Sequence, residues 1–486
     1  MTLATETASD PVIERVAERL TRRMGELLHS YRLPGASAGI VRDGRLAWHA
    51  GFGVADLESR RRTDERTLYR VASISKTFTA TAIVQLRDAG RLGLDDPLVQ
   101  HLPEFAAVRC QHGRVEDVTL RRLLSHRSGL ISEGPFSYWD SMQFPEMAEI
   151  LTRLPETEVV LAPDAGAKYS NLAFALLGEV VARLSGQPYE AYVRERILRP
   201  LGMEESGFAP EFEPGERLAT GYSPHPFEDY PEPSGHTLCS GINAAAGLYT
   251  CVADLARWLT FQCTAAPSAV GPASDPTLDE QLSPEAKAGA GAVLAPRSLD
   301  EMHTPQAIDA NWTAARCLGW MGQRAGERVF LGHGGSMHGF ISQILFHKPS
   351  KSGAIVLTNE GRHEMAGQAA ADLLNLLLDA EQEVSGPQQE APPLPTPPEW
   401  RRFLGRYQLW AGALSHVEYR AGELRLEPAP PAQQALHAPS RLLPSDAPLV
   451  FRVAQGRAAG ELPRFDTAED GAVRGFTLSG FRYTKL

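Results

Sequence analysis

Lysine, asparagine and cysteine are all scarce in this chain of 486 residues. Only six of the 48 basic residues are lysines, and there are only five asparagines, so a motif that needs either residue type is seldom met by chance. The five cysteines are odd in number, scattered, and without a C-x-x-C pair. This pattern fits reduced thiols in a cytosol better than a disulfide framework or a zinc site.

Long apolar runs and clusters of basic residues are also missing. The most apolar stretch, Leu172 to Leu184, contains Gly178, Glu179 and Arg183, and it falls short of the roughly 20 apolar residues that a membrane helix needs. The first 20 residues lack a basic segment followed by an apolar one, so no secretory signal is predicted and we expect a cytoplasmic protein. The net charge of −11 is spread without long like-charge runs, which predicts neither a nucleic-acid nor a membrane partner.

A change of composition divides the chain near residue 390. Six prolines fall within residues 386–398, which predicts an extended linker there. In residues 399–486, short alternating runs such as Val417 to Tyr419 and Leu424 to Leu426 are joined by turn residues, as in antiparallel hairpins. We therefore predict a small C-terminal β-barrel or sandwich, most simply a barrel.

The first 385 residues show a mixed pattern. A hairpin is expected around Asp43-Gly44, a helix over Ile74 to Ala89, and three strands before a helix through Leu373 to Leu378. The expected strands are Arg328 to Leu331, Phe340 to Phe346 and Ala354 to Leu357. The simplest arrangement is an α+β domain. Strands from both ends of residues 1–385 form one sheet, and a helical insertion over about 91–295 lies between them in the sequence. The stretch Thr264 to Ala295, rich in Ala, Ser, Pro and Gly, is predicted to be a surface loop.

One lysine, Lys76, has a serine three residues before it, Ser73. The strand-like segment Leu68 to Ala72 leads into Ser73, and the helix behind it places both side chains on one face, one turn apart. Lysine suits the task of proton acceptor because a desolvated ammonium can lose its proton, whereas a guanidinium cannot. We therefore predict Ser73 as nucleophile and Lys76 as its base; a capping serine beside an exposed lysine is the structural alternative.

Tyr169-Ser170-Asn171 is the one Y-x-N in the sequence, and it precedes a predicted helix over Leu172 to Leu184. A phenol at this place could share a proton with Lys76 and pass it to a leaving group, and the Asn171 amide could hold Lys76 and a substrate carbonyl. The structural alternative for Tyr169 is a partly buried aromatic with a bonded hydroxyl.

His333-Gly334-Gly335-Ser336 follows the predicted strand that ends at Leu331. Paired glycines let backbone approach a ligand closely, so the Ser336 N–H could serve with the Ser73 N–H as an oxyanion donor. His333 could equally be a structural histidine.

Taken in order, Ser73-x-x-Lys76, Tyr169-x-Asn171 and His333-x-Gly335 resemble the three signatures of class C β-lactamases, penicillin-binding DD-peptidases, D-aminopeptidases and β-lactamase-like esterases. Three further segments support the resemblance, namely Leu123 to Leu130, Ala245 to Leu255 and Leu318-Gly319-Trp320. The resemblance covers roughly Pro34 to Thr358. It implies an antiparallel sheet flanked by helices, a helical lobe, an active site between them, and a serine hydrolase that needs no metal or cofactor. A β-barrel appended after a linker also occurs in some peptidases of this superfamily.

The third signature departs from the β-lactamase pattern. Those enzymes usually have Lys-Thr-Gly there, whose ammonium and hydroxyl bind the carboxylate of the antibiotic, whereas this chain has His333 and Gly334. The departure favours a small amide, peptide or ester over a β-lactam. If a carboxylate is bound, Arg324 and Arg328 are the candidate anchors.

Other interpretations are weaker. Gly35-Ala36-Ser37-Ala38-Gly39 matches the G-x-S-x-G nucleophile elbow, but a hairpin rather than a helix follows it. His333 and His338 lack a third ligand for zinc. Four functions stay open, namely peptidase or amidase, carboxylesterase, weak β-lactamase, and a non-catalytic acylated sensor. The sequence also leaves a homo-oligomer open.

Overall fold

The computed structural model describes residues 10–136, 138–209, 215–225, 227–228, 230–264, 293–361, 364–385, 395–410, 413–420, 422–428, 440–454 and 458–486. The chain divides into two compact units, Met1–Val384 and Ser385–Leu486. Each unit has its own hydrophobic core.

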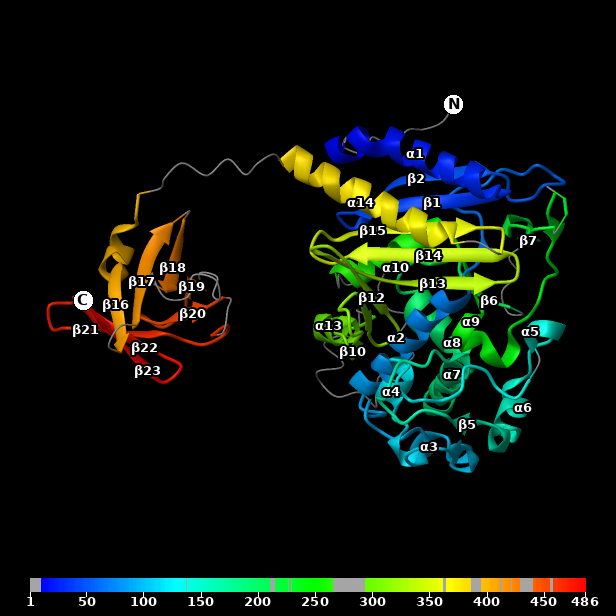
Figure 1. The fold of residues 1–486 in the computed structure, drawn as a ribbon, viewed down its shortest axis with the longest axis horizontal. Helices are drawn as coiled ribbons and strands as arrows, with labels where there is room; N and C mark the ends of the chain where they lie inside the picture. The colour runs from blue at the N-terminus through cyan, green and yellow to red at the C-terminus, as the bar shows by residue number, and fades with distance from the viewer. Residues whose placement is uncertain are drawn as a thin grey trace. The chain divides into compact units, whose positions relative to one another are not determined.

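An eight-stranded antiparallel sheet lies at the centre of the first unit (Figure 1). The strands follow one another in the order β10-β11-β12-β13-β14-β15-β1-β2. Their bounds are β1 Gly35–Arg42, β2 Arg45–Gly53, β10 Ala307–Ile308, β11 Ala314–Arg316, β12 Met321–Ala325, β13 Arg328–Met337, β14 Phe340–His347 and β15 Ser352–Thr358. Because β1 pairs with β15, the sheet joins both ends of the first unit's sequence, as predicted.

Two long helices cover one face of this sheet, α1 (Pro11–Tyr31) and α14 (Met365–Ser385) (Figure 1). The Asp10 side chain caps α1 by accepting from the N–H groups of Val12 and Ile13. Apolar side chains of both helices share one core with the sheet, among them Val16, Leu20, Met24, Leu373, Leu374 and Leu377. These buried side chains cover the outer face of the sheet, so the site lies on the opposite face.

The opposite face is covered by α10 (Val252–Thr264), which contacts β1, β2, β14 and β15, and α2 (Ser75–Asp88) packs against α10. Phe78 of α2 stacks on Trp258 of α10 with ring centroids 4.0 Å apart. Most residues of α2 are buried, so this helix runs through the interior between the sheet and the helical lobe. Its N-terminus is therefore held rigidly by packing on several sides.

The helical lobe is built from short elements and one longer helix, α7 (Asn171–Ser185). The other helices of the first unit, among the residues described, are α3 Leu98–His101, α4 Leu120–Leu124, α5 Tyr138–Ser141, α6 Met147–Thr152, α8 Tyr189–Val193, α9 Asn243–Ala246 and α13 Pro296–His303. The small strands are β3 Tyr69–Arg70, β4 Arg109–Cys110, β5 Glu158–Val159, β6 Gly207–Phe208, β7 Tyr222–Ser223, β8 Glu232–Pro233 and β9 Leu248–Thr250. Short 3₁₀ segments and one π segment (η5) of the described chain lie at η1 Ala72–Ile74, η2 Pro103–Ala107, η3 Val115–Asp117, η4 Leu154–Glu156, η5 Arg194–Leu198, η6 Gly215–Arg217 and η7 Ser240–Ile242.

The second unit is a nearly closed antiparallel barrel with the strand order β20-β19-β18-β17-β16-β23-β22-β21. After the turn η8 (Pro398–Phe403), its strands are β16 Gly405–Trp410, β17 Ala413–Arg420, β18 Glu423–Pro428, β19 Ser440–Pro444, β20 Phe451–Val453, β21 Arg464–Thr467, β22 Val473–Leu478 and β23 Phe481–Lys485. A bridge between Val450 and Arg464 joins the two ends of the sheet. Buried rings of Tyr407, Phe465 and Phe476 contact one another in the interior, so side chains form the centre of the barrel.

Two local predictions were wrong in their extent. The strand predicted over Leu68 to Ala72 is only two residues long, because the backbone leaves the extended conformation at Val71 (ψ 6°) and turns further at the left-handed Ala72 (φ 45°). Strand β13 continues to Met337, so the segment from His333 to Ser336 lies within the strand instead of after it. Three glycines in this strand removed the side-chain alternation by which a strand is predicted.

Two further predictions concern segments that lie mostly outside the described residues. Residues 265–292 of the loop predicted over Thr264 to Ala295, and residues 386–394 of the predicted linker, lie outside the described residues. Within the described parts of the chain, no helix is both long and apolar enough to cross a membrane.

Candidate active site

Ser73 lies on a sharp turn between a short strand and a buried helix. After β3, the left-handed Ala72 turns the chain into the 3₁₀ segment Ala72–Ile74, which the bond from the Ile74 N–H to the Val71 carbonyl closes at 3.1 Å. Helix α2 then begins at Ser75. Packing holds this turn tightly, and Ser73 is left partly exposed between buried neighbours.

Lys76 points from the first turn of α2 back toward Ser73. Its ammonium donates to Ser73 Oγ at 3.1 Å, to Asn171 Oδ1 at 2.7 Å and to the Ala245 carbonyl at 2.9 Å. The side chain is completely buried, and this desolvation lowers the pKa of Lys76 to about 7, with Glu133 and Cys239 opposing the shift. An amine that is half neutral near pH 7 and adjacent to a hydroxyl oxygen can accept the hydroxyl proton.

Tyr169 and Asn171 flank the N-terminus of α7. Ser170 between them is the N-cap, and its Oγ accepts from the Ala173 N–H. The Lys76 ammonium lies 4.8 Å from the centroid of the Tyr169 ring. Burial raises the pKa of the Tyr169 phenol, and a hydrogen bond with Ser73 works against that rise. The phenol is therefore protonated at neutral pH and can donate a proton beside Ser73.

A carboxylate that sequence reasoning missed, Glu133, lies behind Asn171. The Asn171 amide nitrogen donates to Glu133 Oε1 at 2.5 Å, and the Tyr138 hydroxyl donates to Glu133 Oε2. Lys76, Asn171, Glu133 and Tyr138 thus form one chain of hydrogen bonds. The only sequence signal near Glu133 was the phrase Leu123 to Leu130, which ends three residues before it.

Strand β13 closes the other side of the turn. A β-carbon on Gly335 would lie 2.0 Å from the Val71 carbonyl oxygen, so the strand's backbone packs directly on the segment that precedes Ser73. Ser342 of β14 reinforces this contact, because its hydroxyl donates to the same carbonyl at 3.1 Å. Ser336, which follows Gly335 in β13, is exposed and pairs with Ile341 of β14. The structure therefore brings the third sequence motif to the turn that carries Ser73.

His333 is buried and neutral. Its Nδ1 lies 2.6 Å from the Gly334 carbonyl oxygen, which requires the tautomer protonated at Nδ1, and its ring centroid lies 6.4 Å from that of Tyr169. Burial, with Lys76 and Arg316 as lesser causes, lowers the pKa of His333 to about 3. At neutral pH this residue consequently supplies no positive charge to an anionic ligand.

The predicted carboxylate anchors do not serve this site. Arg328 binds Asn375 and Asp379 on α14, and the exposed Arg324 donates to the Gly326 carbonyl in its own hairpin. The cation whose charge reaches the site is Arg316 on β11, which opposes the raised pKa of Tyr169 and lowers that of His333. Sequence reasoning missed Arg316 because nothing distinguished it among 42 arginines.

The alternative motifs have other roles. Ser37 of the G-x-S-x-G match is buried in β1, and its hydroxyl donates to the Asp64 carbonyl at 2.7 Å. His338 is exposed and lies 3.4 Å from Met142 Sδ. Among the residues that the structure describes, no group of three His, Cys, Asp or Glu side chains is placed to hold a metal ion.

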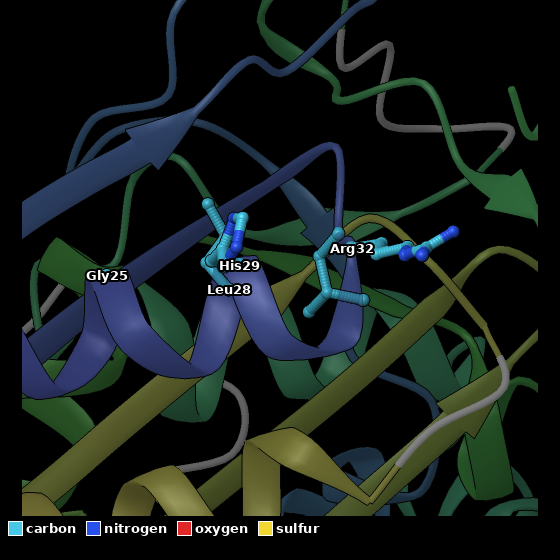
Figure 2. A pocket seen from close by; sticks show the side chains of 5 residues that line it. Gly25, Leu28, His29 and Arg32 are labelled. Carbon is cyan, nitrogen blue, oxygen red and sulfur yellow. The ribbon is translucent and has the colours of Figure 1, made fainter. Parts of the chain in front are cut away.

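A surface pocket lies on the last turns of α1, lined by Gly25, Leu28, His29, Arg32 and Leu33 (Figure 2). Helix α1 covers the outer face of the sheet, whereas the site described above lies on the opposite face. The pocket brings together no nucleophile and base, so it is not a candidate for the same chemistry.

Comparison with known proteins adds to this geometry. A sequence model of the Beta-lactamase family matches residues 18–379. The chain is 37% identical over 240 residues to "Esterase EstB" of Burkholderia gladioli, an alignment that covers 46% of this chain and 60% of that protein. The chain spans about 60% of the length of the curated relatives it matches.

Solved structures show the same fold. The octameric penicillin-binding protein homologue from Pyrococcus abyssi superimposes with a TM-score of 0.62 at 23% identity, covering 96% of this chain and all of that one. A class C β-lactamase from Rhodobacter sphaeroides superimposes with a TM-score of 0.59 at 19% identity, covering 74% of this chain and 99% of that one.

Proposed function

The chain belongs to the β-lactamase family, and we propose that it is a serine hydrolase that cleaves small carboxylic esters through an acyl-enzyme on Ser73. The observation that carries the proposal is the buried ammonium of Lys76, 3.1 Å from Ser73 Oγ and with its pKa lowered to about 7.

In the proposed acylation, Lys76 takes the proton of Ser73 while Oγ attacks the ester carbonyl carbon. The N–H groups of Ser73 and Ser336 stabilise the oxyanion that forms, because Gly335 holds β13 against the turn before Ser73. Tyr169 donates its proton to the leaving alkoxide and regains one from Lys76. Deacylation repeats these steps with water as the nucleophile.

The third motif favours an ester over a β-lactam. A β-lactam carboxylate held by charge-assisted hydrogen bonds gains roughly 1.5 to 3 kcal/mol from each. The neutral His333 and the side-chain-free Gly334 offer neither the ammonium nor the hydroxyl for such bonds. An uncharged ester needs no such anchor, and the relative from Burkholderia gladioli is itself named an esterase.

One observation favours a second candidate, hydrolysis of a peptide or amide that carries a carboxylate. The Arg316 charge reaches Tyr169 and His333, and Arg316 forms no ion pair with any residue that the structure describes. A substrate carboxylate could pair with this guanidinium. Under this alternative, Arg316→Gln raises KM for carboxylate substrates at least tenfold and leaves KM for neutral esters unchanged.

A single purified sample tests both candidates. We expect turnover of short-chain p-nitrophenyl esters, weak or absent turnover of nitrocefin, and slower turnover of D- or L-aminoacyl p-nitroanilides. Fluorophosphonate should phosphonylate Ser73, as read by mass spectrometry. Labelling without any ester or amide turnover would indicate an acylated sensor, and nitrocefin turnover equal to ester turnover would refute the substrate argument. Light scattering on the same sample tests the homo-oligomer.

A further inference from the structure

The proposed mechanism uses Lys76, Asn171 and Tyr169, but it leaves Glu133 without a role. Glu133 touches neither Ser73 nor Lys76 directly. Its two carboxylate oxygens instead accept from Asn171 Nδ2 at 2.5 Å and from the Tyr138 hydroxyl. Both bonds are made to the anionic acceptor, which is the stronger kind of hydrogen bond.

The segment that carries Glu133 is fixed to the start of α7. The Ser132 carbonyl accepts from the N–H groups of Asn171 at 2.8 Å and Leu172 at 3.2 Å, and the Ser170 hydroxyl donates to the Ile131 carbonyl at 2.7 Å. These bonds satisfy backbone groups at a helix N-terminus, where negative charge is also favoured. Glu133 is therefore held at a defined place relative to Asn171.

Asn171 can act on Lys76 only if its amide faces the right way. An amide donates through Nδ2 and accepts through Oδ1, and the protonated Lys76 has only hydrogens to donate. Glu133, as a carboxylate, can only accept, so it selects the orientation with Nδ2 toward itself and Oδ1 toward Lys76. Loss of this selection leaves the amide free to rotate away from the ammonium.

We propose that Glu133 is a positioning residue for Ser73 acylation: it orients the Asn171 amide that holds Lys76, and its charge stabilises the ammonium that forms when Lys76 takes the proton. This inference rests on the proposed function. Glu133 acts through Asn171, so it should affect kcat and the pH profile and leave KM for a neutral ester unchanged.

The groups around Lys76 leave Glu133 as the main anionic influence. Glu133 and the Cys239 thiol raise the pKa of Lys76 against its burial. His126 and His333 lie close enough to influence one another, but burial lowers the pKa of both, so neither is charged near pH 7. Burial raises the pKa of Cys239 and Tyr169, which keeps both protonated.

The decisive variant is Glu133→Gln, which keeps the size and one acceptor but removes the charge. Glu133 raises the pKa of Lys76, so loss of its charge should lower that pKa, by roughly one unit for a nearby charge in a partly screened site. The acid limb of kcat/KM for a p-nitrophenyl ester should therefore move about one pH unit lower, and the weaker base should lower the plateau roughly three- to tenfold. The matched control is Glu156→Gln, an exposed glutamate of the same lobe that pairs with Arg153.

Two further variants separate charge from packing. Tyr138→Phe removes a hydrogen bond but keeps the carboxylate charge, and Glu133→Asp keeps the charge at a shorter reach. Both should leave the acid limb within about 0.3 pH units of wild type, with a lower plateau for Glu133→Asp. If Glu133→Gln does not fold, as judged by circular dichroism, the Asp variant decides: an unchanged plateau overturns the proposal.

The same profiles, measured as rates of Ser73 phosphonylation, separate this inference from the proposed function. Wild-type Ser73 that resists the probe at every pH refutes the function itself. Wild-type Ser73 that reacts, with Glu133→Gln matching the Glu156→Gln control in both acid limb and plateau, refutes only the role of Glu133. A shift in Tyr138→Phe as large as that in Glu133→Gln also overturns it, because packing rather than charge would then be responsible.

Discussion

The ionisation of Lys76 should determine how acylation depends on pH. If its pKa is about 7, the proton-accepting form makes up about one tenth of the enzyme at pH 6, half at pH 7 and nine tenths at pH 8. An ordinary lysine would be neutral in only about 0.1% of molecules near pH 7.5. Burial therefore increases the fraction of competent enzyme several hundredfold at neutral pH.

The assay is kcat/KM for a neutral p-nitrophenyl ester between pH 5 and 9, corrected for spontaneous hydrolysis. We expect a tenfold rise per pH unit below pH 6 and a plateau above pH 8, in the absence of any titrating group on the substrate. Lys76→Arg should lose most of the activity at every pH, because a guanidinium cannot accept the proton. A rate that still rises tenfold per unit at pH 9, or a Lys76→Arg variant with more than about half of the wild-type rate, would refute the reasoning.

Four other changes follow from the same geometry. Ser73→Ala should lower the rate by roughly five or six orders of magnitude and leave the circular dichroism spectrum unchanged; more than a hundredth of the wild-type rate would exclude Ser73 as nucleophile. Tyr169→Phe should slow both acylation and deacylation in burst kinetics, because the phenol proton is lost, whereas a change in KM alone would make Tyr169 a binding residue. Gly335→Ala should abolish activity and lower the melting temperature, since its β-carbon would meet the Val71 carbonyl; Gly25→Ala on α1, which has open space, is the neutral control. Truncation after residue 385 should leave a soluble first unit, and an insoluble fragment would contradict independent folding.

Elements with a regular apolar period were predictable from the sequence. The helices expected over Ile74 to Ala89 and Leu172 to Leu184 end within one residue of α2 and α7. Local rules suffice there because the period of 3.6 residues and the stop at Gly186 act within the segment itself. The same rules predicted a strand shorter than β13, because its glycines interrupt the alternation of apolar and polar side chains.

The candidate site was predictable where its residues recur in fixed motifs and not where they meet only in space. Ser73 and Lys76 are one helical turn apart, so their contact follows from local geometry. Glu133 and Arg316 come from a loop and from a strand near the edge of the sheet, and their relation to Lys76 and Tyr169 depends on the packing of the whole unit. No spacing in the sequence encodes that relation.

The burial of α2 has a cost in stability, because it lowers the pKa of Lys76. A lysine whose pKa falls to about 7 on folding binds fewer protons in the folded than in the unfolded chain between pH 7 and about 10.4, so unfolding free energy rises with pH across that window. Below pH 7 the full cost is present, on the order of 4 to 5 kcal/mol. The same burial that imposes this cost makes Lys76 a base at neutral pH. Its three hydrogen bonds and the apolar packing of Phe78, two residues further along α2, against Trp258 offset the cost, so the stability of the core and the basicity of Lys76 arise from the same placement of one helix.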